Sequence, residues 1–178
     1  MGRLSPNYVI LGLLEQKSGH GYQLLEHFQS PHLLGNIWKL STSRIYSLLK
    51  QLERQEWVTG REEDAPDAPI RTVYWLTDAG RTALFDWLHD AHPAASTRNI
   101  RTEYLSRLYI ARLLGLPTQA ISDAQYESCR ARLNALKAQH ITGIGGLALQ
   151  LQIDELTVIL DWIRACDTAL APEMDSLS

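Results

Sequence analysis

The chain has 178 residues, of which 45% are hydrophobic and 21% charged, a composition typical of a folded globular protein rather than a disordered or fibrous one. Its formal net charge of −3 argues against binding to nucleic acid through overall positive charge, so any DNA binding must depend on local groups of basic residues. The two cysteines exclude a disulfide framework, and the chain shows neither a signal peptide nor an apolar run approaching the about 20 residues that span a bilayer, which predicts a cytoplasmic protein.

The first part of the chain predicts three helices in succession. Ser5 and Pro6 form a favourable helix start, and after a turn the segment GHGYQLLEHF predicts a second, short helix with Tyr22, Leu25 and Phe28 on one face. The third helix has apolar residues at positions i, i+3, i+4 and i+7, which is the spacing of one buried helix face. These residues are Ile45, Leu48, Leu49 and Leu52.

Two segments with a strand-like pattern follow the third helix. Val58–Glu62 and Arg71–Leu76 predict a β-hairpin, and the loop EDAPDAP forms its long tip. Thr77 is the expected N-cap of a further helix. We therefore expect residues 1–90 to form one domain, mainly α with a small β-hairpin.

The second part of the chain is predicted to be entirely helical. Residues 91–99 are small and polar and predict a hinge, and residues 100–178 are expected to form a helical domain. Gly115, Pro117 and the segment GIGG are expected to separate its helices. The last helix has apolar residues that approximate a heptad seam. They are Leu149, Ile153, Leu156, Leu160 and Ile163.

Two antiparallel helices with one apolar seam each cannot bury those seams well alone. A second copy of the chain is the simplest partner, because homodimers are the commonest soluble assembly. We therefore predict an antiparallel helical dimerisation domain. The alternative is that the seams pack back onto the first domain.

The start of the third helix carries a concentration of polar side chains that suits DNA. Recognition helices enter the major groove by their N-terminal end, where serine and threonine can donate to phosphates or base edges and arginine can bind guanine O6 and N7. The alternative is structural, with Ser41 or Thr42 capping the helix and Tyr46 packing in the core. The predicted DNA-binding residues of this helix are Ser41, Thr42, Ser43, Arg44, Tyr46, Ser47 and Lys50.

The order of elements is that of a winged helix-turn-helix domain, in which the hairpin is a wing lying along the DNA backbone or minor groove. Arg61 and Arg71 flank the wing tip at positions suited to phosphate contact. The acidic tip between them would repel DNA, so either this segment points away from DNA or the wing contributes little. Its carboxylates belong to Glu62, Glu63, Asp64 and Asp67.

Three stretches resemble the PadR family of bacterial regulators: GHGYQLLEHF, LSTSRIYSLLKQLERQEWV and RTVYWLTDAGR. The second part of the chain, through EYLSRLYIARLLG and ELTVILDWI, resembles the longer-tailed branch related to virulence-gene activators, whose C-terminal helices form the dimer. The chain departs from the family pattern at Ser47, where proline is usual, at Gln55–Trp57, where glycine is usual, and in its acidic wing. The matching positions are Gly21, Tyr22, Leu24, Tyr46, Leu49, Leu52, Glu53, Tyr74, Leu76, Thr77 and Gly80.

The resemblance implies a homodimeric transcriptional regulator that binds a palindromic DNA operator and responds to a small molecule, often aromatic. A two-fold symmetric dimer must present its recognition helices about 34–36 Å apart. Repression is favoured because blocking a promoter demands the fewest additional contacts. Related regulators have an aromatic pocket near the dimer seam, although plain hydrophobic burial is the alternative for each candidate here. These candidates are Tyr8, Tyr104, Tyr109 and Trp162.

Catalysis has little support, because the chain shows neither a phosphate-binding glycine loop nor a nucleophile elbow. Its histidines do not lie at metal-ligand spacing, and we expect neither a metal nor a cofactor. The main alternative function is a winged-helix module that contacts proteins and has lost specific DNA binding. The negative charge and the acidic wing favour this alternative. Four basic residues on or near the third helix disfavour it, namely Lys39, Arg44, Lys50 and Arg54.

Overall fold

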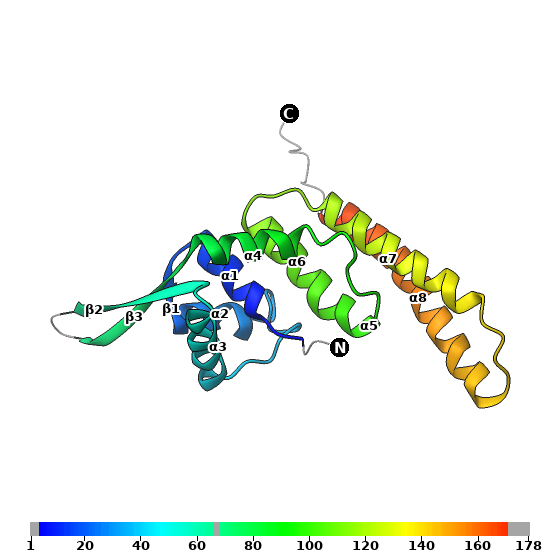
Figure 1. The fold of residues 1–178 in the computed structure, drawn as a ribbon, viewed down its shortest axis with the longest axis horizontal. Helices are drawn as coiled ribbons and strands as arrows, with labels where there is room; N and C mark the ends of the chain where they lie inside the picture. Colours follow the sequence, from blue (N-terminus) through cyan, green and yellow to red (C-terminus); the bar gives the residue numbers. More distant parts are fainter. Residues whose placement is uncertain (1–3, 66–67, 171–178) are drawn as a thin grey trace. The chain divides into compact units, whose positions relative to one another are not determined.

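The computed structural model describes residues 4–65 and 68–170. Its elements divide into two compact units (Figure 1). The described parts of Met1–His89 and Leu105–Pro117 form the first unit, and those of Asp90–Tyr104 and Thr118–Ser178 form the second. The expected hinge at residues 91–99 stays a prediction, and Leu105–Pro117 packs with the first unit rather than with the residues that follow the hinge.

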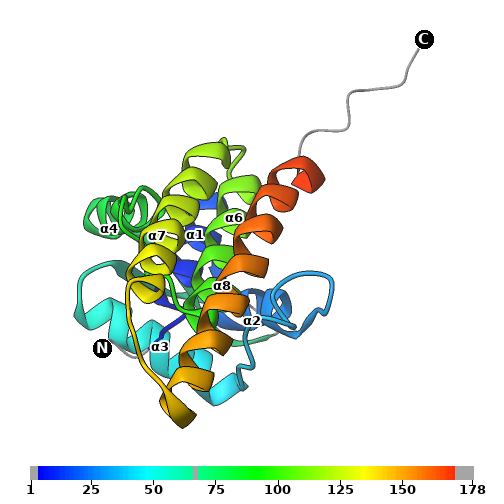
Figure 2. The same ribbon diagram turned by 90° about the vertical axis from the view of Figure 1, so that its right-hand side faces the viewer.

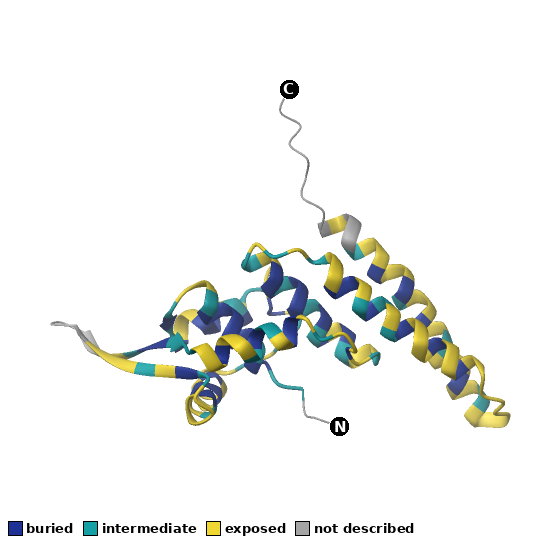
Figure 3. Cartoon of the chain, turned by 45° about the horizontal axis from the view of Figure 1, so that its top comes forward, coloured by how far each residue is buried: buried dark blue, intermediate teal, exposed yellow. Residues whose placement is uncertain are grey.

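The first unit is built from helices around an aliphatic core. Ile10, Leu11, Leu48 and Leu49 are fully buried there, and the buried positions of these helices are dark blue in Figure 3. Helix α1 packs against α4 and α6, and Gly12 permits the close approach to α6, because a Cβ at this position would overlap the side chain of Ile110. The helices are α1 (Asn7–Gln16), α2 (Gly21–Gln29), α3 (Thr42–Arg54), α4 (Asp78–Leu88) and α6 (Leu105–Leu113).

A three-stranded antiparallel sheet with the strand order β1-β3-β2 completes the first unit. The predicted hairpin is confirmed, with Val58 paired to Leu76 and Glu63 paired to Arg71. Both of its strands extend further into the tip than the sequence predicts. Strand β1 has only two residues, too few for a period-two pattern, and is absent from the sequence prediction. The strands are β1 (Gly19–His20), β2 (Val58–Ala65) and β3 (Ala68–Leu76).

Helix α3 is followed, after its C-cap Gln55, by a residue with left-handed backbone geometry, Glu56, whose φ is 58°. The N–H of Trp57 donates to the carbonyl of Leu52 at 3.0 Å, and the N–H of Glu56 donates to that of Glu53 at 3.0 Å. This is the hydrogen-bond pattern of a Schellman helix end, where glycine is usual because it has no Cβ. The chain therefore holds a glutamate in a strained conformation at a position where the resemblance implies glycine.

Replacing Glu56 with glycine should raise the free energy of unfolding by about 0.5–1 kcal/mol, because glycine adopts a positive φ without the steric penalty of a side chain. Urea denaturation followed by circular dichroism measures this change. The control is Glu56→Ala, which removes the carboxylate but keeps the Cβ, and we expect no stabilisation from it. An equal gain in both variants would assign the effect to charge and contradict the prediction.

In the second unit, helices α7 and α8 form an antiparallel pair (Figure 2). Leu133 and Leu136 of α7 are buried, as are Leu156 and Ile163 of α8. The heptad seam that the sequence analysis assigns to a partner molecule is therefore buried largely within the chain, because α7 covers it. The elements of this unit are α5 (Thr97–Asn99), the π-helix η1 (Ile100–Tyr104), α7 (Gln119–Lys137) and α8 (Gly143–Leu170).

The GIGG segment does not separate the two long helices, contrary to the sequence prediction. Helix α7 ends at Lys137, and α8 begins at Gly143, so the break lies at residues 138–142. Glycines are tolerated in the first turn of α8 because the N–H groups there have no intrahelical hydrogen bonds to maintain.

Helix α8 has a second apolar face. Its members recur at helical spacing and lie along one side of the helix, and we call this face the α8 stripe. The stripe consists of Ile144, Leu147, Leu151, Val158 and Trp162, which are 39–84% exposed. By length and composition alone, Gly143–Cys166 is also apolar enough to cross a membrane, with a mean hydropathy of 1.3. From the sequence, no apolar run of this kind is predicted. Core helices of soluble proteins meet the same test.

Candidate nucleic-acid interface

Helix α3 has an apolar face that anchors it and a polar face that is open to solvent. Its anchoring residues Ile45, Leu48, Leu49 and Leu52 are all 0% exposed. Every residue of this helix and its cap that the sequence analysis assigns to DNA is exposed, as a contact surface requires. These residues are Ser41, Thr42, Ser43, Arg44, Tyr46, Ser47 and Lys50.

The start of α3 is organised by Ser41. Its Oγ accepts a hydrogen bond from the N–H of Arg44 at 3.3 Å and lies 3.1 Å from the Oγ of Ser43. Ser41 therefore caps the helix, which confirms the structural alternative for this residue, and its DNA contact stays a prediction. Among the described residues of the first turn none is acidic, so the positive end of the helix dipole is not offset there.

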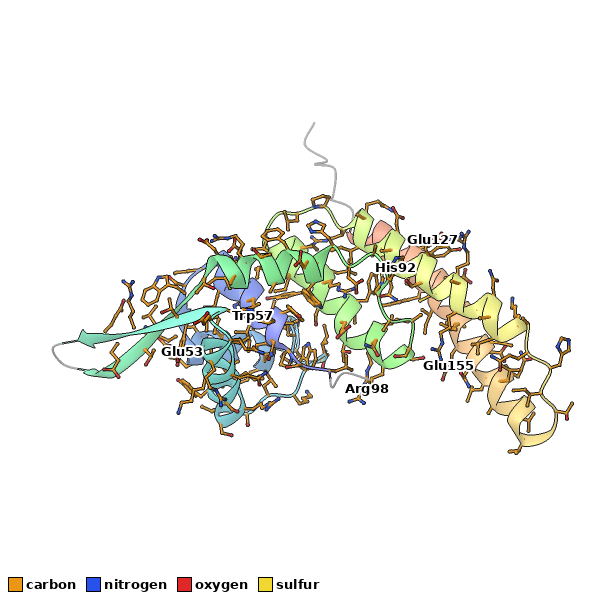
Figure 4. All side chains as sticks on the ribbon, viewed as in Figure 1. Glu53, Trp57, His92, Arg98, Glu127 and Glu155 are labelled. Carbon is orange, nitrogen blue, oxygen red and sulfur yellow. The ribbon has the colours of Figure 1, made fainter. Side chains whose placement is uncertain are left out.

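The end of α3 is tied to the base of the hairpin by Glu53. Its side chain is labelled in Figure 4, and its Oε1 accepts a hydrogen bond from the N–H of Gly60 at 3.0 Å. Burial, with a smaller contribution from the Glu53 carboxylate, raises the pKa of Tyr74 beside it. The Tyr74 phenol is therefore neutral at physiological pH. Because Glu53 faces the hairpin, its negative charge lies away from the exposed start of α3.

The two arginines of the hairpin lie over aromatic rings. The guanidinium carbon of Arg61 is 5.8 Å from the ring centre of Trp75, and that of Arg71 is 5.7 Å from the ring centre of Tyr22. Both distances fall in the range of cation–π interactions. These contacts restrain the two guanidinium groups while both residues remain exposed.

Acidic side chains lie beside these arginines on the hairpin. Glu62 and Glu63 are exposed, and Glu63 lies directly across the strand pair from Arg71. The side chain of Asp64 and the whole of Asp67, the other acidic residues expected at the tip, lie outside the described residues. The described part of the hairpin therefore offers both signs of charge to a DNA backbone.

A recess of about 490 Å³ lies between the start of α2, the first half of α3 and strand β3. It is lined by His20, Tyr22, Tyr46, Arg71 and Thr72. Tyr46 and Arg71 are predicted from the sequence to contact DNA, but no sequence pattern indicates that the five residues lie together. They meet because the short strand β1 pairs with β3, which brings the start of α2 beside the hairpin.

The sequence prediction for Tyr22 is wrong in one respect. Leu25 and Phe28 are buried as expected, but Tyr22 is 42% exposed. A spacing of three residues falls about 60° short of a full helical turn, so two such steps rotate Tyr22 away from the face that buries Phe28. The preceding Gly21 permits the close approach of Tyr46, because a Cβ there would lie 2.7 Å from Cε1 of Tyr46, but it does not indicate the position of Tyr22.

Two of the aromatic residues expected to bind an effector lie in the first unit, in separate clusters. Tyr8 stacks on Trp87 with ring centres 5.3 Å apart, and the hydroxyl of Tyr109 lies 2.7 Å from Nδ1 of His27. Burial lowers the pKa of His27, against a smaller opposing effect of Glu26, and burial raises the pKa of Tyr109. Both groups of this hydrogen-bonded pair are therefore neutral near pH 7.

The other two candidates, Tyr104 and Trp162, lie in the second unit. Tyr104 is 0% exposed, and its hydroxyl lies 3.0 Å from the Oγ of Ser122. The ring of Trp162 meets that of Tyr104 edge-on, with centres 6.0 Å apart. Burial accounts for the position of Tyr104, and an effector role for the four residues stays a prediction.

The described residues contain no group of three or more His, Cys, Asp or Glu side chains that could hold a metal ion. Burial raises the pKa of the Cys129 thiol, which keeps it protonated and unreactive. The exposed start of α3 offers hydrogen-bond donors and positive charge, and the described part of the hairpin offers both arginines and glutamates.

Comparisons with known proteins show the family to which the chain belongs. Residues 10–86 match the transcriptional regulator PadR-like family. The negative transcriptional regulator PadR of Bacillus subtilis is 30% identical over 136 residues, which are 75% of this chain and 71% of that protein. The crystal structure of Bacillus subtilis PadR in complex with operator DNA matches 95% of this chain and 99% of that chain, at 24% identity and a TM-score of 0.49. That of the same protein with p-coumaric acid matches 92% and 94%, at 24% identity and a TM-score of 0.42.

The family match covers the segment from α1 to α4 and includes the three stretches that carry the resemblance in the sequence. The similarity to the Bacillus regulator extends beyond this segment, and the matched relatives are transcriptional regulators rather than enzymes. The expected winged-helix fold and the expected family are confirmed. This chain is a member of the PadR-like family of transcriptional regulators.

Proposed function

We propose that this chain represses transcription as a homodimer bound to a palindromic DNA operator. The observation that carries the proposal is the exposed polar start of α3, held on a fully buried apolar face. Arg44 is the residue proposed to read a base, because arginine binds guanine with two hydrogen bonds. Thr42 and Ser43 are proposed to contact phosphates or base edges, and Arg61 and Arg71 to contact the backbone.

The α8 stripe is the surface that we propose for dimerisation. Four of its five residues form two pairs that are symmetric about the midpoint between Asp154 and Glu155. Two antiparallel copies of α8, related by a two-fold axis through this midpoint, would place these apolar residues on one another, whereas Asp154 would face Glu155 at the axis and the exposed Asp161 would face Ala148. A two-fold interface must be self-complementary in this way. The facing pairs are Leu151 with Val158, Leu147 with Trp162, and Ile144 with Ala165.

The two carboxylates at the proposed axis already have partners within the chain. Asp154 Oδ1 accepts a hydrogen bond from Nε2 of Gln150 at 2.8 Å, and Glu155 Oε2 accepts one from Oγ1 of Thr97 at 3.2 Å. These hydrogen bonds hold the two side chains to their own chain. The like charges that meet at the axis oppose the pairing, so the apolar pairs on either side must supply the favourable free energy.

A small aromatic molecule is the effector that we propose, by analogy with the p-coumaric acid bound to the Bacillus relative. Tyr8, Tyr104, Tyr109 and Trp162 remain the candidate contacts, and the cytoplasm is the proposed compartment. An effector of this kind releases DNA only by its differential affinity for the free and bound arrangements. Titration with p-coumaric acid should therefore quench tryptophan fluorescence and weaken operator binding together.

The test of the proposed function is a titration of the protein against the DNA upstream of its own gene. We expect specific binding that weakens steeply with salt, with a footprint that overlaps a promoter. The alternative function is a winged-helix module that contacts proteins, favoured by the net charge of −3 and by the exposed Glu62 and Glu63. Absent or salt-insensitive DNA binding together with a copurifying protein partner would support this alternative.

Replacing Glu63 with glutamine should strengthen DNA binding roughly two- to fivefold at low ionic strength, because an exposed charge beside the backbone is worth at most about 1 kcal/mol. Fluorescence anisotropy with a labelled operator measures the change. Glu127→Gln on α7 is the matched control, since it removes the same charge from the second unit. Equal gains in both variants would indicate net charge alone, and no gain in either would indicate that the wing tip points away from DNA.

A further inference from the structure

One wall of the recess between α2, α3 and β3 is a stack of three side chains. The guanidinium of Arg71 lies over the ring of Tyr22, and Tyr22 stacks on His20 with ring centres 5.5 Å apart and planes 10° from parallel. Nδ1 of His20 lies 3.1 Å from the carbonyl oxygen of Thr72. The far end of the stack is therefore tied to the same strand that carries Arg71.

The other wall is formed by Tyr46 on the first half of α3. Gly21 permits this position, because a Cβ there would lie 2.7 Å from Cε1 of Tyr46 and 3.2 Å from Cδ1 of Leu49. Tyr22 and Tyr46 remain 42% and 38% exposed. One guanidinium and two phenols therefore border the same hollow.

The chemistry of this recess suits a phosphate group. A guanidinium binds phosphate oxygens with two parallel hydrogen bonds, and a phenol can donate a third. None of the five lining residues is acidic. Because the aromatic stack already restrains the Arg71 side chain, binding a ligand sacrifices less side-chain entropy than it would with a freely moving arginine.

We propose that this recess binds one phosphate of the DNA backbone, on the strand that borders the major groove entered by α3. The inference rests on the proposed function and deepens it: the backbone contact proposed for Arg71 becomes a defined phosphate site, which the hydroxyls of Tyr22 and Tyr46 complete. A phosphate held beside Tyr46 fixes the orientation of α3 in the groove without reading sequence. A free phosphate compound has the same chemistry, and the experiments below separate the two sources.

The first experiment compares Arg71→Ala with Arg44→Ala on the operator and on an unrelated duplex over a range of salt concentrations. Arg71→Ala should weaken binding to both duplexes by the same factor, roughly tenfold. The decrease of log K with log salt should become less steep by about 2, because each of the two recesses of the dimer loses one phosphate contact. Arg44→Ala should mainly lose the preference for the operator. Unchanged affinity and slope in Arg71→Ala, with an unchanged melting temperature, would overturn the inference.

The second experiment replaces backbone phosphates of the operator one at a time with neutral methylphosphonates. Neutralising either phosphate of one symmetric pair should weaken operator binding by the wild-type protein. The same substitutions should leave the operator affinity of Arg71→Ala unchanged. The matched control is Arg61→Ala, which removes the other arginine of the hairpin and should stay sensitive at that pair. Tyr22→Phe keeps the aromatic stack but lacks the phenol hydroxyl. Neutralising the same phosphates should therefore weaken its operator binding less than it weakens that of the wild-type protein. An Arg71→Ala protein that remains sensitive at every position would refute the assignment.

Free phosphate is tested directly by calorimetry with inorganic phosphate and no DNA. Phosphate binding that needs Arg71, together with DNA binding that does not, would assign the recess to a free phosphate compound and overturn the DNA assignment. A wild-type protein that binds no duplex would overturn the proposed function and the inference with it. A wild-type protein that prefers its operator, with an Arg71→Ala variant that binds equally well, would overturn the inference alone.

Discussion

Replacing Leu151 with aspartate should convert the protein from a dimer to a monomer at micromolar concentration. In the proposed antiparallel pairing each Leu151 faces Val158 of the second copy, so the variant would bury two unpaired carboxylates in an apolar interface. If each copy costs about 2 kcal/mol, the dissociation constant of the dimer rises roughly 1,000-fold. Operator affinity should fall by a factor of about 10² or more, because a monomer binds each half-site independently.

Sedimentation analysis measures the change in mass, and fluorescence anisotropy measures the loss of operator binding. Gln152→Glu is the matched control, because this exposed residue lies about 100° around α8 from Leu151 and adds the same charge outside the stripe. We expect the control to remain dimeric. A Leu151→Asp protein with native helicity and unchanged mass would exclude the α8 stripe as the interface.

The direction of the pairing has its own test by cysteine cross-linking. The double variant Leu151→Cys/Val158→Cys should form an intermolecular disulfide on oxidation, since these positions face each other across the proposed axis. Leu151→Cys alone should not, because its two copies would lie about 10 Å apart along the helices. Efficient cross-linking of the single variant would instead indicate a parallel pair. The wild-type chain, which contains the buried Cys129 and the half-buried Cys166, measures the cross-linking that its native cysteines give.

Local periodicity was sufficient to predict α3 and the hairpin. Ile45, Leu48, Leu49 and Leu52 follow the period of one buried helix face, and all four are buried. The strands around the hairpin are flanked by a helix end and by the Thr77 cap, which leaves little freedom in their register. Local physical chemistry therefore determines the elements that carry the candidate DNA contacts.

Periodicity was insufficient for α8, because this helix has apolar residues on two faces. Leu156 and Ile163 follow one heptad pattern, and Leu151 and Val158 follow another on the opposite side of the helix. Sequence alone does not distinguish the face that packs on α7 from the face left exposed, since both satisfy the same spacing rule. The argument that an unburied apolar seam needs a second copy of the chain therefore applies to the α8 stripe. It does not apply to the face of α8 that packs on α7.

The recess between α2, α3 and β3 could not be predicted from the sequence for a different reason. Tyr22 and Arg71 are far apart in the chain and meet only because β1 pairs with β3. A two-residue strand has no periodic signal, so the contact that assembles the recess depends on tertiary packing. Gly21 is the one local sign of a close approach, and its meaning is apparent only once Tyr46 is placed beside it.

Replacing Arg44 with alanine should reduce operator affinity by about 1–3 kcal/mol for each half-site, roughly five- to 150-fold, if this side chain reads a guanine. The side chain is exposed, and the helix cap depends on the Arg44 backbone N–H, which alanine retains. The variant should therefore fold normally, as its melting temperature would verify. Affinity for an unrelated duplex should change little, because phosphate contacts elsewhere remain.

Base substitution in the operator identifies what Arg44 reads. The wild-type protein should discriminate against replacement of one G·C pair in each half-site, and Arg44→Ala should bind the original and substituted operators equally at that position, because the side chain that distinguishes them is gone. Arg54→Ala is the control on the same helix: its Nε donates to the carbonyl of Lys50 at the other end of α3, and the variant should keep the discrimination. A folded Arg44→Ala protein with full affinity and full discrimination would show that the start of α3 does not read bases through this arginine.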